Sequence, residues 1–199
     1  MITKKYETKE EWLDGRLGKI TGSRLKDIVV KRGTDEKIGF YEIIAERIAE
    51  PADEENAMQR GVRLEDEAIE MFIEKTGKKV DTSLVIWQRE DDKNIAISPD
   101  GFIGKKEAVE VKCLSSAKHI EAYITQQIPS DYEYQSLQYF IVNDSLETLY
   151  FVFYDPRMPE KLQLFFLEIK RDEEKVQEYL QYQRDKLEKI ENIITELTF

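Results

Sequence analysis

The chain has 199 residues, 41% of them hydrophobic, which is enough for one domain with a substantial core. It contains one cysteine, Cys113, and one histidine, His119. These counts exclude an internal disulfide, a cysteine-built zinc or iron–sulfur site, and any mechanism that needs two histidines. No run of residues approaches the ~20 apolar positions of a membrane-spanning helix, and the charged start of the chain is unlike a signal peptide, so we expect a cytoplasmic protein.

In chain order, hydrophobic periodicity predicts helices over 38–49 and 58–75, strands over 80–89, 94–98 and 108–113, helices over 116–125 and 130–142, strands over 148–154 and 162–169, and a helix over 172–197. Gly77 is placed to end the second helix, and Ser130 with Glu133 forms a capping box for the fourth. The order predicts an α/β or α+β fold, with a mixed central sheet of about five strands flanked by helices.

The charge of the chain is unevenly distributed. Its net charge is −11, whereas residues 16–37 contain seven basic and three acidic side chains and so carry +4. An acidic surface argues against a protein that coats nucleic acid nonspecifically, but a basic segment could hold one phosphate strand in a groove. From charge alone, a solvated helix and loop explains the segment equally well.

The stretch ISPDGFIGKKEAVEVKCL carries two carboxylates and an ammonium group. In a strand, Glu110 and Lys112 point to one face while Val109 and Val111 point to the other. Asp100, one hairpin turn away, could share a divalent cation with Glu110, and oxygen ligands favour Mg²⁺ or Mn²⁺. A lysine beside such a metal suits phosphodiester hydrolysis. The alternative is a charged hairpin surface without a site.

Other residues have structural alternatives. Glu65 could add a third carboxylate from helix 58–75, although by itself it is typical of a surface acid. We expect His119 on a helix surface and Cys113 in a packed interior. Three tyrosines could stack on bases but are more typical of core and interface packing. They are Tyr132, Tyr134 and Tyr139.

Several ordered motifs together resemble one family. They are Trp12, RLGKITGS at 16–23, GxxxExxA at 61–68, SPDG at 98–101, EVKC at 110–113, Gln135, Gln138 and YDPRM at 154–158. This order is similar to that of the family of phage lambda exonuclease and the YqaJ-type viral recombinases, in the PD-(D/E)xK nuclease superfamily. The resemblance covers Trp12 to about Arg171, most of the chain.

The resemblance implies a single nuclease domain over residues 1–199 with a PD-(D/E)xK, restriction-endonuclease-like core. Within it, a basic N-terminal segment covers about 12–37, a catalytic core about 58–170 and a C-terminal helix about 172–197. The implied activity is that of a metal-dependent 5′→3′ exonuclease. Such an enzyme digests the 5′-ended strand of linear double-stranded DNA and leaves 3′ overhangs for phage-type recombination by strand annealing.

The resemblance also implies residue roles. The implied ligands of Mg²⁺, with Mn²⁺ possible and two ions per site, are Asp100, Glu110, the carbonyl of Val111 and, for a second ion, Glu65. Lys112 would activate water, and Gln135 is favoured over Gln138 as a further catalytic residue. The 5′-phosphate would contact Arg16, Ser23 and Ser98, a guanidinium fork with two hydroxyls that suits a terminal phosphate. Lys31 and Arg32 are candidates for guiding the strand.

As partners, the family implies linear double-stranded DNA with a 5′-phosphate, a homotrimeric ring around it, and a phage single-strand annealing protein. No membrane is implied, and the expected location is the cytoplasm of a bacterial host, with a phage or prophage gene. Two alternatives stay open. An endonuclease of the same fold would not need a pocket for a free 5′ end, and a noncatalytic DNA-binding subunit would not need the intact set Glu65, Asp100, Glu110 and Lys112.

Overall fold

The computed structural model describes residues 8, 11, 37–49 and 57–198. Contacts divide the chain into two units. The first unit is formed by Met1–Leu64, Cys113–Gln127 and Phe153–Phe165, and the second by Glu65–Lys112, Ile128–Val152 and Phe166–Phe199. The prediction of a single domain over residues 1–199 stays a prediction.

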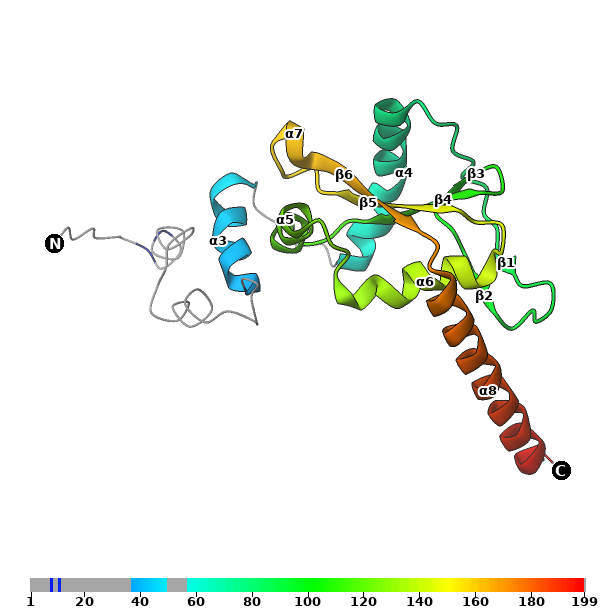
Figure 1. The fold of residues 1–199 in the computed structure, drawn as a ribbon. Helices are drawn as coiled ribbons and strands as arrows, with labels where there is room; N and C mark the ends of the chain where they lie inside the picture. Colours follow the sequence, from blue (N-terminus) through cyan, green and yellow to red (C-terminus); the bar gives the residue numbers. More distant parts are fainter. Residues whose placement is uncertain (1–7, 9–10, 12–36, 50–56, 199) are drawn as a thin grey trace. The chain divides into compact units, whose positions relative to one another are not determined.

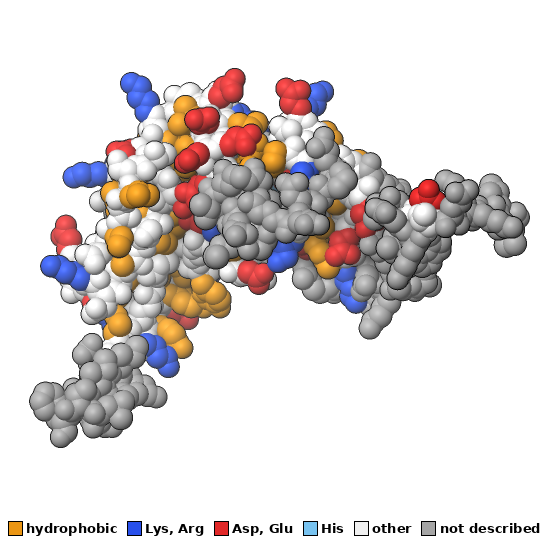
Figure 2. Space-filling view, turned by 180° about the vertical axis from the view of Figure 1, so that it is seen from behind, with side chains coloured by type: hydrophobic (Ala, Val, Ile, Leu, Met, Phe, Trp, Pro, Cys, Tyr) orange, Lys and Arg blue, Asp and Glu red, His pale blue; other side chains and the backbone are white. Residues whose placement is uncertain are grey.

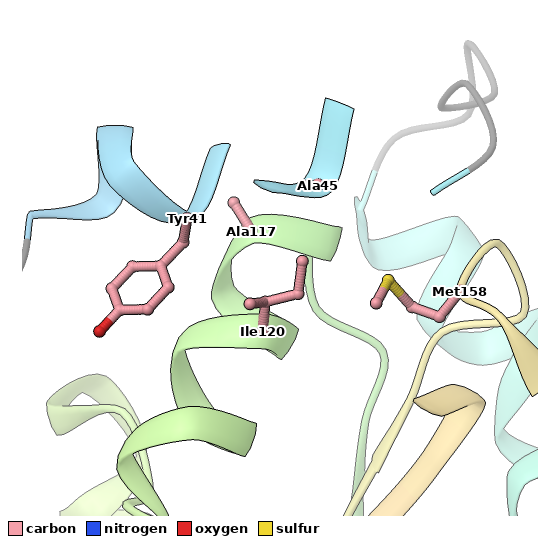
Figure 3. Close-up of a cluster of buried hydrophobic side chains, with 5 residues drawn as sticks. All are labelled: Tyr41, Ala45, Ala117, Ile120 and Met158. Atoms are coloured by element: carbon pink, nitrogen blue, oxygen red, sulfur yellow. The ribbon is translucent and has the colours of Figure 1, made fainter. Parts of the chain in front are cut away.

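In the first unit, helix α3 (Ile38–Ile48) packs on helix α5 (Ser116–Thr125). Tyr41 and Ala45, one turn apart on α3, meet Ala117 and Ile120 of α5 (Figure 3). Met158 completes this buried cluster. The two residues of each helix are three or four positions apart, which is the spacing that defines an apolar helix face. Both helices confirm their predictions from periodicity, because each buries one stripe of apolar side chains.

The main sheet has four strands in the order β3 (Gly101–Ile103), β4 (Glu107–Lys112), β5 (Thr148–Tyr154) and β6 (Leu164–Lys170) (Figure 1). Strands β3 and β4 form an antiparallel hairpin. Two further short strands, β1 (Trp87–Gln88) and β2 (Ala96–Ile97), make a separate antiparallel pair. The fold is therefore a mixed α/β arrangement with a four-stranded sheet.

The sequence-based prediction of about five strands in one sheet was wrong in three places. The strand predicted over 94–98 is reduced to β2, which pairs with β1 outside the main sheet. The predicted strand over 80–89 is reduced to β1 and an isolated bridge between Asp81 and Phe102. Leu84 and Ile86 in this stretch are exposed. Residues with high β propensity stabilise a strand mainly when their side chains pack on a sheet surface, and these two side chains do not. Strand β3 was not predicted, because its three residues follow a proline and carry too short a pattern.

Two helices contact side chains on opposite faces of the sheet in the second unit. Helix α4 (Ala57–Thr76) places Phe72 against Tyr150 of β5 and Phe166 of β6, at ring distances of 5.3 and 5.2 Å. Tyr132, just before helix α6 (Glu133–Val142), packs on Phe151. Since Tyr150 and Phe151 are consecutive in a strand, they point to opposite faces, one towards each helix.

The start of α6 differs from the predicted capping box. Residues Ser130–Tyr132 form a 3-10 turn, and no side chain caps either this turn or α6. The amide of Glu133, which the Ser130 side chain would have capped, instead donates to the backbone carbonyl of Ser130. A backbone oxygen therefore replaces the side chain as the acceptor in this turn.

Two arginines bind the carboxyl end of α6. Arg89, 8% exposed, donates to the carbonyl of Ile141 and pairs with Asp144 at 2.8 Å. Arg171 donates to the carbonyl of Phe140 at 2.6 Å. Cationic donors at a helix C-terminus satisfy carbonyls that have no partner within the helix, so these two arginines hold α6 against the rest of the second unit.

The remaining elements agree closely with the predictions. A short helix α7 (Glu160–Gln163) precedes β6, so that strand begins two residues later than predicted. The long terminal helix is α8 (Glu173–Thr198), which extends from the end of β6 (Figure 1). None of the described helices is both long and apolar enough to cross a membrane.

On the face of the molecule seen in Figure 2, acidic and basic side chains of the described residues lie interspersed. The basic segment over 16–37 lies outside the described residues, except Lys37. The predicted basic groove therefore stays a prediction.

Gly101 is required at the start of β3. A Cβ atom added there would lie 2.5 Å from Cγ1 of Val80, which is too close for two carbon atoms. We expect Gly101→Ala to lower the free energy of unfolding by about 1–3 kcal/mol, as overpacking does. Urea denaturation measures this loss. Adding Val80→Ala removes the clashing methyl group and should recover part of it, and a double variant no more stable than Gly101→Ala alone would contradict the assignment.

Candidate active site

Strand β4 places Glu110 and Lys112 on one face of the sheet in contact with each other. Nζ of Lys112 lies 2.5 Å from Oε1 of Glu110. Glu110 is 1% exposed, so it is a buried carboxylate and not part of a solvated surface. The period-2 alternation of the strand predicted the shared face, but the burial comes from α6, which covers it.

Asp100 immediately precedes β3 and is hydrogen-bonded to β4. Its Oδ2 accepts from the amide of Val111 at 2.7 Å. The antiparallel register pairs Gly101 with Val109, which carries Asp100 to the level of Glu110. The hairpin partner of β4 is therefore β3 and not the strand predicted over 94–98.

The environment of Asp100 disfavours its charged form. Burial raises the pKa of Asp100 to about 7, and the negative charges of Glu110 and Glu65 act in the same direction. The amide of Val111 and the ammonium group of Lys112 oppose this shift. Asp100 therefore lies in an excess of negative charge that a cation would relieve.

Glu65 belongs to the same electrostatic cluster. It is a half-buried residue of α4, and its pKa is raised by burial, then by Asp66 and Glu110, while Lys112 lowers it. The charges of Glu110 and Lys112 therefore act on Glu65, although the described residues contain no group of three carboxylates close enough to hold a metal ion. Desolvated carboxylates that repel one another are typical of functional sites.

Helix α6 supplies hydrogen-bond donors to Glu110. Nε2 of Gln135 lies 2.6 Å from Oε1 of Glu110, and the hydroxyl of Tyr139 donates to Oε2. Gln138, the alternative glutamine, points elsewhere: it pairs with Gln183 of α8 at 2.7 Å. The structure therefore brings Gln135 to the site and not Gln138.

Tyr139 contacts the site, although its sequence context is more typical of core packing. It is fully buried, and burial together with the charge of Glu110 raises its pKa far above the usual value, so its hydroxyl keeps its proton. The signal that points to it is its position four residues after Gln135, which places both on one helix face. Tyr132 also reaches the site, because Nζ of Lys112 lies 5.1 Å from its ring centre.

The predicted phosphate-binding and strand-guiding residues are mostly outside the described part of the chain. Arg16, Ser23, Lys31 and Arg32 lie there. Ser98 is described, exposed, and two residues before Asp100. Whether these residues bind a 5′-phosphate stays a prediction.

The lone histidine and the lone cysteine differ from expectation. His119 is buried rather than on a helix surface, with Nε2 2.8 Å from the carbonyl oxygen of Leu162 and its ring against Phe165. Cys113 is half-buried where full burial was expected. The surface prediction for His119 failed because α5 packs this side of the helix inwards, which the sequence pattern did not indicate.

The donor atoms fit a hard cation. Asp100, Glu110 and Glu65 offer carboxylate oxygens, and Val111 offers a carbonyl oxygen. Within 37–49 and 57–198, no group of three or more His, Cys, Asp or Glu side chains is gathered closely enough to hold a metal ion. Mg²⁺ is commonly bound by only one or two carboxylates while it keeps several waters. The Asp100–Glu110 pair therefore fits Mg²⁺ without a third close carboxylate.

The raised pKa of Asp100 predicts how metal-free stability depends on pH. Because the folded state binds the Asp100 proton more tightly than the unfolded state does, its contribution to the free energy of unfolding falls as pH rises from about 4 to about 7. We expect Asp100→Asn to remove this contribution. Chemical denaturation of both proteins in EDTA, at a series of pH values, measures the difference. A difference that does not vary between pH 4 and 7 would contradict the raised pKa of Asp100.

The chain is similar to one protein family and to solved exonuclease structures. The YqaJ-like viral recombinase domain model matches residues 11–145. A crystal structure of the alkaline exonuclease LHK-Exo from Laribacter hongkongensis is 29% identical, with a TM-score of 0.58, and covers 95% of this chain and 100% of that chain. The structure of LHK-Exo in complex with dAMP is 30% identical, with a TM-score of 0.57 and the same coverage.

A third similar structure shows the fold alone. It is a phage-related exonuclease from Haemophilus somnus 129PT, 15% identical, with a TM-score of 0.52, covering 98% of this chain and 92% of that chain. A search of curated proteins found no match.

The likeness to LHK-Exo over 95% of this chain and 100% of that chain, together with the mixed α/β fold, places the chain in the class of alkaline exonucleases. Within that class, the chain belongs to the family of the YqaJ-like viral recombinase domain.

Proposed function

We propose that this protein is a metal-dependent exonuclease that digests the 5′-ended strand of linear double-stranded DNA and leaves 3′ overhangs. The observation that carries the proposal is the group of contacts made by β4. Buried Glu110 pairs with Lys112, and Asp100 accepts from the amide of Val111 beside them. Membership of the YqaJ-like family and the likeness to alkaline exonucleases support it.

The chemistry follows from the donors and charges of the site. Asp100, Glu110 and the carbonyl of Val111 would hold Mg²⁺, with Glu65 bearing on a second ion. When bound, Mg²⁺ would polarise the scissile phosphate and lower the pKa of a coordinated water. Lys112 would orient the attacking water and offset negative charge on the phosphate as the phosphorus–oxygen bond breaks. Gln135 would assist by fixing Glu110, to which it donates.

The direction of digestion depends on recognition of the 5′ end. We propose that Arg16, Ser23 and Ser98 bind the 5′-phosphate and that Lys31 and Arg32 guide the strand. A homotrimeric ring would keep the enzyme on its DNA, and a single-strand annealing protein would receive the 3′ overhang. These proposals follow from the family resemblance, and the exposed position of Ser98 near Asp100 is compatible with them.

One assay tests the proposal. A linear duplex with one 5′-phosphate and one 5′-hydroxyl end, labelled at each end separately, is incubated with the protein in Mg²⁺ or in EDTA. We expect digestion only in Mg²⁺, starting from the 5′-phosphate end, with the complementary strand left intact. Digestion from 3′ ends, or equal digestion of both 5′ ends, would contradict the assigned polarity or phosphate recognition.

Closed circular DNA separates the alternatives. An exonuclease leaves the circle intact, whereas an endonuclease of the same fold cuts it. A protein that binds the linear duplex but leaves it undigested in both Mg²⁺ and Mn²⁺ would support the noncatalytic alternative.

A further inference from the structure

The acidic site contains a tyrosine contact that the family motifs do not include. Tyr139 is fully buried on α6, and its hydroxyl donates to Oε2 of Glu110. Its ring packs edge-on against Trp87 of β1, with ring centres 6.3 Å apart. The ring is therefore held in place by packing, and the hydroxyl is directed at one oxygen of the carboxylate.

The contacts of Glu110 divide between its two oxygens. Oε1 receives Nζ of Lys112 and Nε2 of Gln135, at 2.5 and 2.6 Å. Oε2 receives the hydroxyl of Tyr139. Each carboxylate oxygen has two lone pairs, so two donors occupy Oε1, whereas Oε2 keeps one lone pair for another partner.

We propose that Tyr139 is a positioning residue that fixes the plane of the Glu110 carboxylate so that Oε2 presents its remaining lone pair to a divalent cation. This inference rests on the proposed function, in which Glu110 is a metal ligand. Partners that hydrogen-bond a ligating carboxylate orient it, and their loss typically weakens metal binding by about 10–100-fold.

The test compares two tyrosines that donate to glutamates of the same strand. Tyr139→Phe removes the hydroxyl at the site and keeps the ring. Tyr150→Phe is the matched control, because the hydroxyl of Tyr150 donates to Oε1 of Glu107, at 3.0 Å, on the other face of β4. Three quantities are measured for each variant. Isothermal titration calorimetry gives the Mg²⁺ affinity, and a digestion assay gives the dependence of DNA hydrolysis on Mg²⁺ concentration. Thermal denaturation in EDTA gives the stability.

We expect Tyr139→Phe to weaken Mg²⁺ binding by about 10–100-fold and to move half-maximal digestion to a correspondingly higher Mg²⁺ concentration. Tyr150→Phe should lose thermal stability without a change in Mg²⁺ affinity. A Tyr139→Phe protein with unaltered Mg²⁺ affinity overturns the inference, whatever its stability, because a purely structural hydroxyl would affect stability alone.

The outcomes distinguish this inference from the proposed function. If the unaltered protein binds Mg²⁺ but digests no DNA, the proposed function fails. The Mg²⁺ affinities of the unaltered protein and of Tyr139→Phe still decide the role of Tyr139. If the unaltered protein binds neither Mg²⁺ nor Mn²⁺, both fail. If near-ultraviolet circular dichroism shows that Tyr139→Phe does not fold, the unaltered protein labelled with 3-fluorotyrosine is titrated with Mg²⁺. A fluorine spectrum in which no tyrosine responds then overturns the inference.

Discussion

We expect Asp100→Asn to reduce DNA hydrolysis in Mg²⁺ by about 10³-fold or more while DNA binding persists. Loss of a metal-binding carboxylate removes several kcal/mol of transition-state stabilisation, and each 1.4 kcal/mol corresponds to about tenfold in rate. Asparagine is preferred to alanine because its side-chain oxygen can still accept from the amide of Val111, which holds the β3–β4 hairpin. The defect then reports on the charge and not on a broken hairpin.

Digestion of a labelled linear duplex measures the rate, and gel-shift binding in Ca²⁺ measures retention of DNA. The matched control is Asp81→Asn. Asp81 is an exposed aspartate whose backbone pairs with Phe102 of β3 and whose side chain accepts from the amide and the hydroxyl of Ser83. We expect nearly normal hydrolysis from the control. An Asp100→Asn enzyme that keeps more than about a tenth of the normal rate would remove Asp100 from the metal site.

We expect Lys112→Met to reduce hydrolysis by about 10²–10³-fold, the usual cost of losing one group that stabilises developing charge. Methionine keeps most of the length and apolar stem of lysine but removes the ammonium group. The same change leaves buried Glu110 without its cation, beside Asp100 and Glu65. Breaking a buried ion pair costs about 3–5 kcal/mol, and we expect the lower end, because Gln135 and Tyr139 still donate to Glu110.

Mg²⁺ separates these two effects, because a bound cation should restore part of the stability of Lys112→Met but not its rate. Thermal denaturation with and without Mg²⁺, together with the digestion assay, makes the comparison. Lys78→Met is the matched control, since Lys78 pairs with Glu107 on the other face of β4 at 3.0 Å and is partly exposed. Normal hydrolysis by Lys112→Met would show that the ammonium group has no role in the reaction.

Helices were the part of the fold most accessible to sequence reasoning. The spacing of Tyr41 with Ala45 and of Ala117 with Ile120 is a local property of the chain, and it defines apolar stripes without knowledge of the partner. Strands were harder. The stretch over 80–89 has strand-like composition, yet most of it makes no ladder, because pairing needs a second segment that local sequence does not specify.

The candidate site also has features that local sequence predicts and features that depend on tertiary packing. Alternation of side chains along any strand was enough to predict that Glu110 and Lys112 share a face, and ordered motifs around them carried the family resemblance. Packing of separate elements was needed to show that α6 covers this face, that Asp100 binds the amide of Val111, and that Tyr139, not Gln138, contacts Glu110. These contacts join residues 11 to 29 positions apart. They depend on how separate elements pack, which no local periodicity encodes.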